Sequence, residues 1–345
     1  MAISDTFDPS VGSPTSSKGP SVSNREDLTD VLTILAPEET PALSSANKQS
    51  ASSTFVEWTV DSLSAPSTDG ISEGADITAF TDQFANRARL GNYVQKFRRD
   101  YMVSDLQEAV DSVGPAKVAQ AEAKAIRELK RDVEATILSD NEQQAETGAQ
   151  PYKLRGLGQW VESAANTGGA GVPSNVATDY LPPAASIDAN GAAITEAQFN
   201  TIVRSIYRVN GEANNLVLIA DTSLRKQIAD FARFSADSAV SANAGVRSVN
   251  YDGMSSTIKL SVEIYQSDFG IVSIINMNPE TNPDTLAGNT AHDRGYMINP
   301  DYYGIHELIP MGSTRLPNMG GGERGFVDCA LTLGVYAPAA HGKIV

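Results

Sequence analysis

Three glycines near the C-terminus have the spacing of a phosphate-binding loop. Gly320, Gly322 and Gly325 match the pattern G-x-G-x-x-G, in which backbone N–H groups bind the pyrophosphate of a dinucleotide. That chemistry needs a strand before the glycines and a helix N-terminus after them. Here the segment follows the loop-like sequence GSTRLPNM and precedes an apolar, strand-like run. We therefore interpret residues 320–325 as a glycine-rich connector between two parts of a sheet, and we predict no cofactor.

Side chains that often bind metals or act as nucleophiles are few and scattered. His306 begins the sequence HELIP, without the second histidine of a helical zinc site, and His292 and His341 lie apart from it. The sequence AHDRG at 291–295 could orient a histidine with an acid, but no nucleophile motif accompanies it. The single cysteine, Cys329, lies in the apolar run FVDCALTLGVY, which favours a small buried side chain. We predict no catalytic residue and no metal site, and we do not expect an enzyme.

Composition narrows the classes of protein further. The chain has 345 residues, which is enough for two or more domains, and its net charge is −16. A duplex-binding protein normally has a basic surface, so DNA binding is not expected to be the main activity. No apolar run approaches the roughly 18 residues of a membrane span, and the N-terminus lacks the pattern of a signal peptide. We expect no membrane partner.

The clearest periodic segment runs from Ser104 to Asp140. Ser104 followed by Gln107 is typical of a capping box and predicts a first short helix. Pro115 suits the first turn of a second helix of about 25 residues, longer than the usual ~11–12. Its apolar stripe repeats at a helical spacing. Pairs four residues apart should form weak ion pairs on the opposite face, namely Lys124 with Glu128 and Lys130 with Glu134. The stripe consists of Val118, Ala121, Ala125, Leu129, Val133 and Ile137.

Residues 51–103 are predicted to form a long β-hairpin with a divided charge. SSTFVEWTV and GNYVQKFRRDYMVS are the two strand candidates. From residue 49 to residue 86 there are six acidic side chains and no lysine or arginine, whereas residues 87–99 carry five basic side chains and no acid. The charges could pair across one solvated hairpin, or they could contact other subunits. The residues we select for inter-subunit contact are Asp69, Glu73, Asp76, Arg87, Arg89, Lys96, Arg98 and Arg99.

The remaining chain is a flexible-looking arm, a loop-rich region and a mixed α/β pattern. Residues 1–24 are rich in Ser, Pro and Gly, residues 25–36 suggest a short amphipathic helix, and residues 148–191 are rich in loop sequences. Helices are predicted at 195–209 and 222–234, and AAHGKIV at the C-terminus is interpreted as the tail that follows the final strand. Strands are predicted within NNLVLIAD and at 258–265, 269–277, 296–298, 303–308 and 324–336.

This order of elements resembles the major capsid proteins of tailed bacteriophages, which have the Hong Kong 97-type fold. Three passages carry the resemblance: FVEWTVDSLSAP with ISEGAD, the hairpin return RARLGNYVQKFRRDYMVS, and KAIRELKRDVEATIL leading into RGLGQWV. The similarity is strongest over residues 28–160, and beyond residue 195 it depends mainly on element order.

The resemblance implies an α+β fold with named parts. Residues 1–50 would be the N-terminal arm, and 51–103 the extended hairpin, or E-loop, that lies over an adjacent subunit. Residues 104–194 would be the peripheral domain, with 104–140 as its spine helix. Residues 195–312 would form the axial domain, and 313–345 would return to the peripheral domain.

The implied function is structural. Copies of the chain would assemble as hexamers and pentamers into an icosahedral shell around the packaged phage genome. Portal, scaffold and decoration proteins would be further partners, with only weak, non-specific contact to DNA. The protein would be made in the cytoplasm of the bacterial host and reside in the virion. Two alternatives stay open at this point: a cell-surface or extracellular array protein, and an α/β enzyme whose best candidate site is the 320–325 loop.

Overall fold

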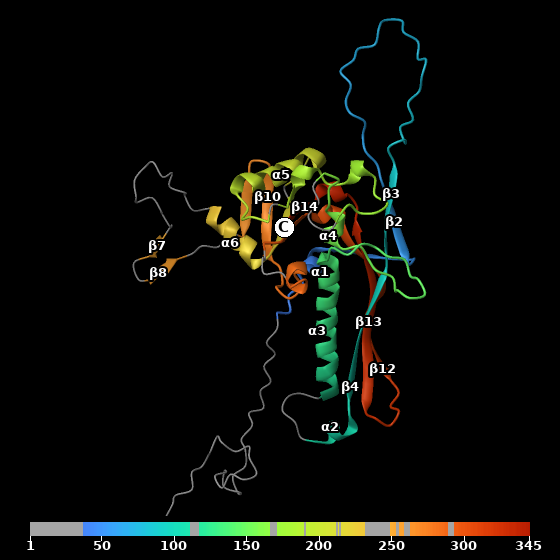
Figure 1. The fold of residues 1–345 in the computed structure, drawn as a ribbon, viewed down its shortest axis with the longest axis vertical. Helices are drawn as coiled ribbons and strands as arrows, with labels where there is room; N and C mark the ends of the chain where they lie inside the picture. The colour runs from blue at the N-terminus through green and yellow to red at the C-terminus, as the bar shows by residue number, and fades with distance from the viewer. Residues whose placement is uncertain are drawn as a thin grey trace, which may run out of the picture.

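The chain forms two main sheets on either side of one long helix, as the computed structural model shows (Figure 1). The structure describes residues 37–110, 117–165, 171–189, 191–211, 213, 215–231, 249–252, 255–258, 263–288 and 293–345. The predicted arm at 1–24 and helix at 25–36 lie outside these ranges. An elongated part holds the long helix and a four-stranded sheet, and beside it lies a second part built on a six-stranded sheet.

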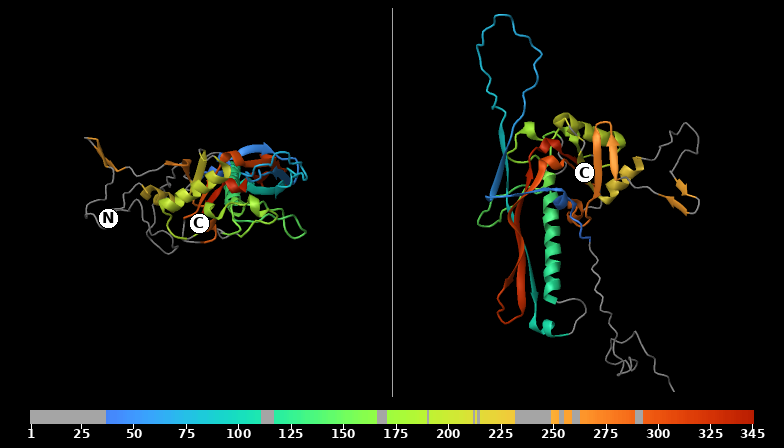
Figure 2. Two further views of the ribbon diagram at one scale, coloured as in Figure 1. Left: turned by 90° about the horizontal axis from the view of Figure 1, so that it is seen from above. Right: turned by 180° about the vertical axis from the view of Figure 1, so that it is seen from behind.

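The two helices predicted at 104–140 are confirmed. The first is α2 (Asp105–Ala109), and the Ser104 side chain accepts a hydrogen bond from the N–H of Gln107. The second is α3 (Lys117–Leu138), 22 residues and so roughly 33 Å long at ~1.5 Å per residue. Its stripe is buried at Ala125, Leu129, Val133 and Ile137, and α3 packs along β4 and β13. Figure 2 shows from behind how the helix runs beside the long strands.

Of the two ion pairs predicted along α3, one forms and the other does not. Lys124 lies 3.8 Å from Glu128, as predicted. Glu134, however, is fully buried and binds the backbone N–H groups of Ala42 and Leu43 instead of Lys130. The reason is that the short helix α1 (Pro41–Ser45) crosses α3 at this point and covers the carboxylate. The periodicity of one helix does not reveal which distant segment will lie on it.

The four-stranded sheet has the order β1-β12-β13-β4. Its strands are β1 (Asn47–Ser50), β12 (Tyr303–Leu316), β13 (Glu323–Val335) and β4 (Gln95–Val103). The strand predicted at 303–308 is too short, because β12 continues past Pro310 to residue 316. Two shifts in its register against β13, between Glu307 and Ile309 and between Ile309 and Gly312, let the pairing continue around the proline.

The predicted hairpin is divided between two sheets. Only β2 (Phe55–Val60) and β3 (Ala88–Tyr93) pair as a hairpin, and Phe55 opposite Tyr93 is their last pair. The run predicted as a single second strand leaves this hairpin at Val94, whose N–H donates to the carbonyl of Thr54 at 2.8 Å. It continues as β4 and pairs with β13, because β2 offers no further partner.

The six-stranded sheet has the order β5-β14-β11-β6-β10-β9. Two helices predicted from periodicity are confirmed beside it: α5 (Glu196–Asn210), with a capping box at its start and the left-handed Gly211 at its end, and α6 (Thr222–Phe231). The tail prediction is wrong, since β14 lies inside this sheet. The strands are β5 (Ile187–Asp188), β14 (Gly342–Ile344), β11 (Gly295–Ile298), β6 (Leu216–Ala220), β10 (Gly270–Asn276) and β9 (Ile264–Ser267).

Short elements complete the described chain. They are α4 (Leu157–Trp160), α7 (Pro283–Leu286), the paired strands β7 (Val249–Asp252) and β8 (Ser255–Ile258), and four single 3-10 turns at 178–180, 184–186, 300–302 and 338–340. The strand predicted at 258–265 corresponds to the end of β8 and the start of β9, with 259–262 outside the described residues. No helix in the described ranges is long and apolar enough to cross a membrane.

The core is built on both faces of the six-stranded sheet. Tyr296 and Ile298 of β11 face a first cluster that includes the buried stripe of α3 and the inner face of the four-stranded sheet. Met297, between them, faces a second cluster formed mainly with α5 and α6. The alternation along β11 therefore joins the two parts of the molecule into one packed structure.

Candidate functional site

The glycine-rich segment is a strand-to-strand turn. It lies between β12 and β13, with Gly320 and Gly322 at φ angles of 93° and 119°. A Cβ atom on Gly322 would overlap the carbonyl of Val103, so this position needs glycine for both conformation and space. No helix follows the turn, and its backbone therefore lacks the geometry that binds a dinucleotide.

The thiol and imidazole groups that could do chemistry are buried. Burial, followed by the charges of Asp328 and Glu307, raises the pKa of the Cys329 thiol to about 12. Burial lowers the pKa of His341 to about 4. Within the described ranges no three His, Cys, Asp or Glu side chains converge as a metal site. His292, part of the AHDRG sequence, lies outside those ranges.

A long extension between β2 and β3 is the most exposed part of the chain. Residues 61–87 leave the hairpin and project beyond the rest of the molecule (Figure 1). Leu63 is 99% exposed, and Ile71 and Phe80 are each 89% exposed, with Ile77 and Phe84 also open to solvent. Apolar side chains gathered on one exposed segment mark a surface that binds another macromolecule.

The acidic residues selected from the sequence lie on this extension. Asp69, Glu73 and Asp76 are exposed, and they form no ion pair with any residue that the structure describes. The basic residues at its base do pair within the hairpin. Arg87 lies 2.8 Å from Asp61, and Arg89 lies 3.7 Å from Glu57. Cross-strand pairing therefore accounts for these two arginines.

The other three basic residues lie on β4, away from the extension. Lys96 pairs with Asp328 of β13 at 3.0 Å. Arg99 faces α3 and binds both carboxylate oxygens of Asp132 at 2.5 and 2.7 Å, and this hydrogen bonding raises its pKa. Arg98 points to the opposite face, is exposed, and has no ion pair in the described chain. The structure thus does not bring the eight selected residues together, and it leaves Arg98 and the three acids available to other molecules.

The short helix α1 is held on α3 by a buried carboxylate. Glu134 accepts hydrogen bonds from the N–H of Ala42 at 2.7 Å and from that of Leu43 at 2.8 Å. The Tyr303 hydroxyl donates to the carbonyl of Ala42 at 3.0 Å. Burial raises the pKa of Glu134 to about 7, although the two N–H bonds oppose the shift. No signal in the sequence distinguishes Glu134 from the solvated acids of the same helix.

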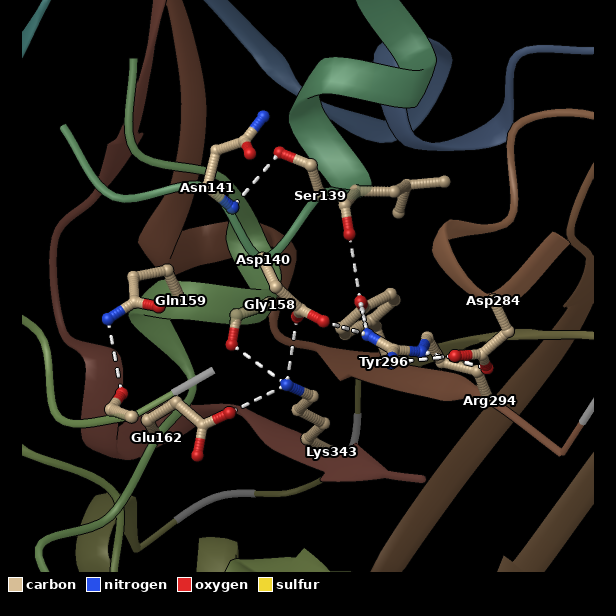
Figure 3. Close-up of polar contacts among 12 residues, drawn as sticks. Ser139, Asp140, Asn141, Gly158, Gln159, Glu162, Asp284, Arg294, Tyr296 and Lys343 are labelled. Atoms are coloured by element: carbon tan, nitrogen blue, oxygen red, sulfur yellow. Dashed lines mark hydrogen bonds and ion pairs between the residues drawn. The ribbon is translucent and has the colours of Figure 1, made fainter. Parts of the chain in front are cut away.

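A second polar cluster, which sequence reasoning missed, lies where the two parts of the molecule meet (Figure 3). Lys343 of β14 is fully buried, and its Nζ donates to Asp140 Oδ1 at 3.0 Å, Glu162 Oε1 at 2.7 Å and the carbonyl of Gly158 at 3.0 Å. Asp140 follows α3, whereas Gly158 and Glu162 lie in and just after α4. The cluster thus joins β14, the strand next to the edge strand β5, to the end of the long helix.

Arg294 extends this cluster toward α7. Its guanidinium lies 2.6 Å from Asp140 Oδ2 and binds both carboxylate oxygens of Asp284 at 2.8 and 3.0 Å. Burial opposes its charge, but Tyr296 and the two carboxylates outweigh burial, and the pKa of Arg294 is raised. The Tyr296 hydroxyl donates to the carbonyl of Leu138 at 2.8 Å. Arg294 belongs to the AHDRG sequence, whose only visible signal was a histidine beside an acid.

Comparisons with known proteins identify the chain's relatives. The family model described as SU10 major capsid protein matches residues 13–345. No curated protein matches the chain. Many solved structures do, and three illustrate the likeness, each with a TM-score of 0.58. The capsid of cyanophage P-SCSP1u is 14% identical and covers 94% of this chain and 92% of its own.

The other two structures are also capsids. The empty GTA particle capsid is 13% identical, with 97% of this chain and 98% of that chain covered. The capsid of cyanophage A-1(L) is 15% identical, with 93% and 96% covered. These similarities establish the fold, which is the α+β architecture of the Hong Kong 97 type.

Proposed function

Because the chain belongs to the SU10 major capsid protein family, we propose that its exposed extension joins copies of it into the hexamers and pentamers of a phage head. Family membership makes it a structural, shell-forming protein of the virion and not an enzyme. The cell-surface array and enzyme alternatives find no support.

The proposal also covers the finer partners and parts. Portal, scaffold and decoration proteins would meet the shell, the packaged DNA would contact it weakly because the net charge is −16, and synthesis would occur in the cytoplasm of the bacterial host. The division into arm 1–50, E-loop 51–103, peripheral domain 104–194, axial domain 195–312 and returning segment 313–345 is proposed on the same basis. Two strands cross the proposed boundaries. β12 begins at Tyr303, within the proposed axial domain, but pairs in the four-stranded sheet. β14 lies within the proposed returning segment but pairs in the six-stranded sheet.

The observation that carries the proposal is the exposure of residues 61–87. A segment with five exposed large apolar side chains, among them Leu63 and Phe80, has no core of its own. A two-stranded hairpin is marginally stable in water even without such a loop at its end. Burial against another copy would remove this apolar surface from water, and repetition around a shell would make many modest contacts strong together.

Charge suggests where the extension binds. It carries acids that are unpaired within the described chain, while Arg98 presents a cation on the outer face of the four-stranded sheet. A neighbour's Asp69, Glu73 or Asp76 would be attracted to that face and kept from like-charged surfaces. Lys96 and Arg99 contribute less, because both already pair within their own chain.

The test is assembly of charge-reversal variants. We expect Arg98→Glu to reduce shell formation, and a triple change of Asp69, Glu73 and Asp76 to Lys to do the same, with combined reversal restoring part of it. Arg208→Glu, an exposed arginine on α5, is the matched control. Shells are counted by electron microscopy and light scattering, and folding is checked by circular dichroism. Normal shells from both single-sided variants would refute the proposed charge contact.

A second variant tests the extension itself. Replacing residues 63–84 with a short Gly-Ser linker leaves β2, β3 and both cores intact, since none of these residues belongs to them. We expect folded subunits that form no closed shells. Closed shells of normal size from this variant would contradict the role assigned to the extension.

A further inference from the structure

The environment of Lys343 is unusual for a lysine. Its side chain is fully buried, although a lysine is almost never buried unless it is paired. All three acceptors around its Nζ come from one short stretch of chain, 140–162, and each lies within 3.0 Å. The amine is therefore fixed in position and orientation against the carboxyl group of Asp140 (Figure 3).

A second carboxylate lies on the other side of the amine. Glu162 is fully buried, and its Oε1 is 2.7 Å from Nζ. On the far side of Asp140, the Arg294 guanidinium lies 2.6 Å from Oδ2. The carboxyl carbon of Asp140 thus stands between an amine with a nearby proton acceptor and a fixed cation. These are the groups that amide formation between the two side chains requires.

We propose that Lys343 and Asp140 form an intramolecular isopeptide bond, assisted by Glu162 and Arg294. The proton on Nζ first moves along the existing hydrogen bond to Oδ1, which leaves a neutral amine beside a neutral acid. Nζ then attacks Cγ of Asp140 and forms the C–N bond. Glu162 takes the second proton from Nζ and delivers it to Oδ1. The C–Oδ1 bond breaks, and Oδ1 leaves as one molecule of water, so the balance needs no other reactant.

Each neighbouring group has a definite part in this step. Glu162 is the catalytic acid and base, because it touches the nitrogen whose proton must move. Arg294 holds Oδ2, the oxygen that gains negative charge in the tetrahedral intermediate and remains as the amide carbonyl. Gly158 makes room, since a Cβ atom at that position would overlap Asp140 Oδ1.

Burial favours the product over the ion pair. The buried charge of Lys343 costs desolvation energy, and condensation with the half-buried Asp140 converts the ion pair to one neutral amide. The bond would join β14, an inner strand of the six-stranded sheet, to the end of α3. A covalent joint would then connect the two packed parts of the subunit.

The experiment is a mass measurement on the full-length protein, both as free subunits and from assembled shells. The chain is denatured, its intact mass is determined, and it is then digested with trypsin. We expect an intact mass below that of the sequence by one water. Fragment 132–153, which holds Asp140, should be found joined to fragment 325–345, which holds Lys343.

Two variants make the result specific. Lys343→Met keeps the length of the side chain without the amine and should give the full mass with two separate fragments. Glu162→Gln should slow bond formation by about 100-fold, the contribution of a positioned acid–base group. A wild-type chain of full mass with separate fragments overturns the proposal. So does a loss of water that persists in Lys343→Met, as a succinimide at another aspartate would produce.

This outcome is independent of the proposed assembly. Shells whose subunits give separate fragments refute the bond and leave the shell function standing. Linked fragments from subunits that never assemble support the bond and count against the assembly contacts.

Discussion

The carboxylate of Glu134 should make the stability of the subunit depend on pH in a direction opposite to that of an ordinary paired acid. Burial raises its pKa from 4.5 to about 7 in the folded chain, so the folded state binds this proton more tightly than the unfolded state does. The resulting stabilisation is complete below pH 4.5. It is lost as the pH rises through about 7, because the buried group must then ionise.

The size of the effect follows from the two pKa values. The interval from 4.5 to about 7 corresponds to about 3 kcal/mol of unfolding free energy. Glu134→Gln removes the titrating carboxyl group but keeps the shape of the side chain. It keeps one oxygen for the N–H of Ala42 and places an amide donor against the N–H of Leu43, which costs a further ~1–2 kcal/mol at every pH.

The assay is urea unfolding of unassembled subunits between pH 5 and pH 9, monitored by the fluorescence of Trp58 and Trp160. The quantity to compare is the difference in unfolding free energy between wild type and Glu134→Gln, because all other titrating groups cancel in it. We expect this difference to fall by about 3 kcal/mol from pH 5 to pH 9. Glu128→Gln is the matched control, because this carboxylate lies on the same helix but is half-exposed and pairs with Lys124.

A constant difference for Glu134→Gln as well would refute the reasoning. It would mean that the hydrogen bonds from Ala42 and Leu43 compensate fully for burial, and that α1 is held by an ordinary carboxylate. A difference that rises with pH would show that these N–H groups, at the start of the short helix α1, outweigh burial.

Two further predictions concern the core. Leu129→Asp should unfold the subunit, because Leu129 is fully buried in the α3 stripe and the change costs more than about 4 kcal/mol; soluble protein with native circular dichroism would show that α3 is not a core element. Cys329 should not react with a thiol reagent at pH 8 in the native state, since it is 1% exposed and its pKa is about 12, and should react fully in denaturant. Rapid labelling of the native chain would contradict its burial.

The local sequence pattern was sufficient to predict an element wherever the element's own side chains determine its structure. The stripe from Ala125 to Ile137 predicts α3, and the capping pattern of Ser104 with Gln107 predicts where α2 begins. Pairing partners were not predictable in this way. The chain around Val94 continues the same β-favouring composition from β3 into β4, so nothing local marks the point where it changes sheets. The tail that contains Lys343 is too short and too rich in small residues to suggest a strand with a partner on each side.

The polar sites escaped prediction for a related reason. Lys343 and Asp140 lie far apart in the sequence, and Glu134 looks like any acid on a charged helix face. Each acquires its environment only when another segment covers it. A sequence of 42 acidic side chains gives no means of selecting the few that become buried. The extension was easier to recognise, because its lack of basic residues over a long range is itself a local property.

The contrast between charged side chains that are paired within the chain and apolar side chains that are left exposed supports assembly independently of family membership. Buried charges such as Lys343, Arg294 and Glu134 have close partners within the chain. On β4, the outer strand of the four-stranded sheet, Lys96 and Arg99 are also paired internally, and charged side chains of this kind discourage random edge pairing. Residues 61–87 differ from both, because Leu63, Ile71 and Phe80 are almost fully exposed and the three selected acids form no ion pair in the described chain. The exposed apolar side chains of this segment, such as Leu63 and Phe80, would be removed from water by contact with another copy, as the proposed assembly requires.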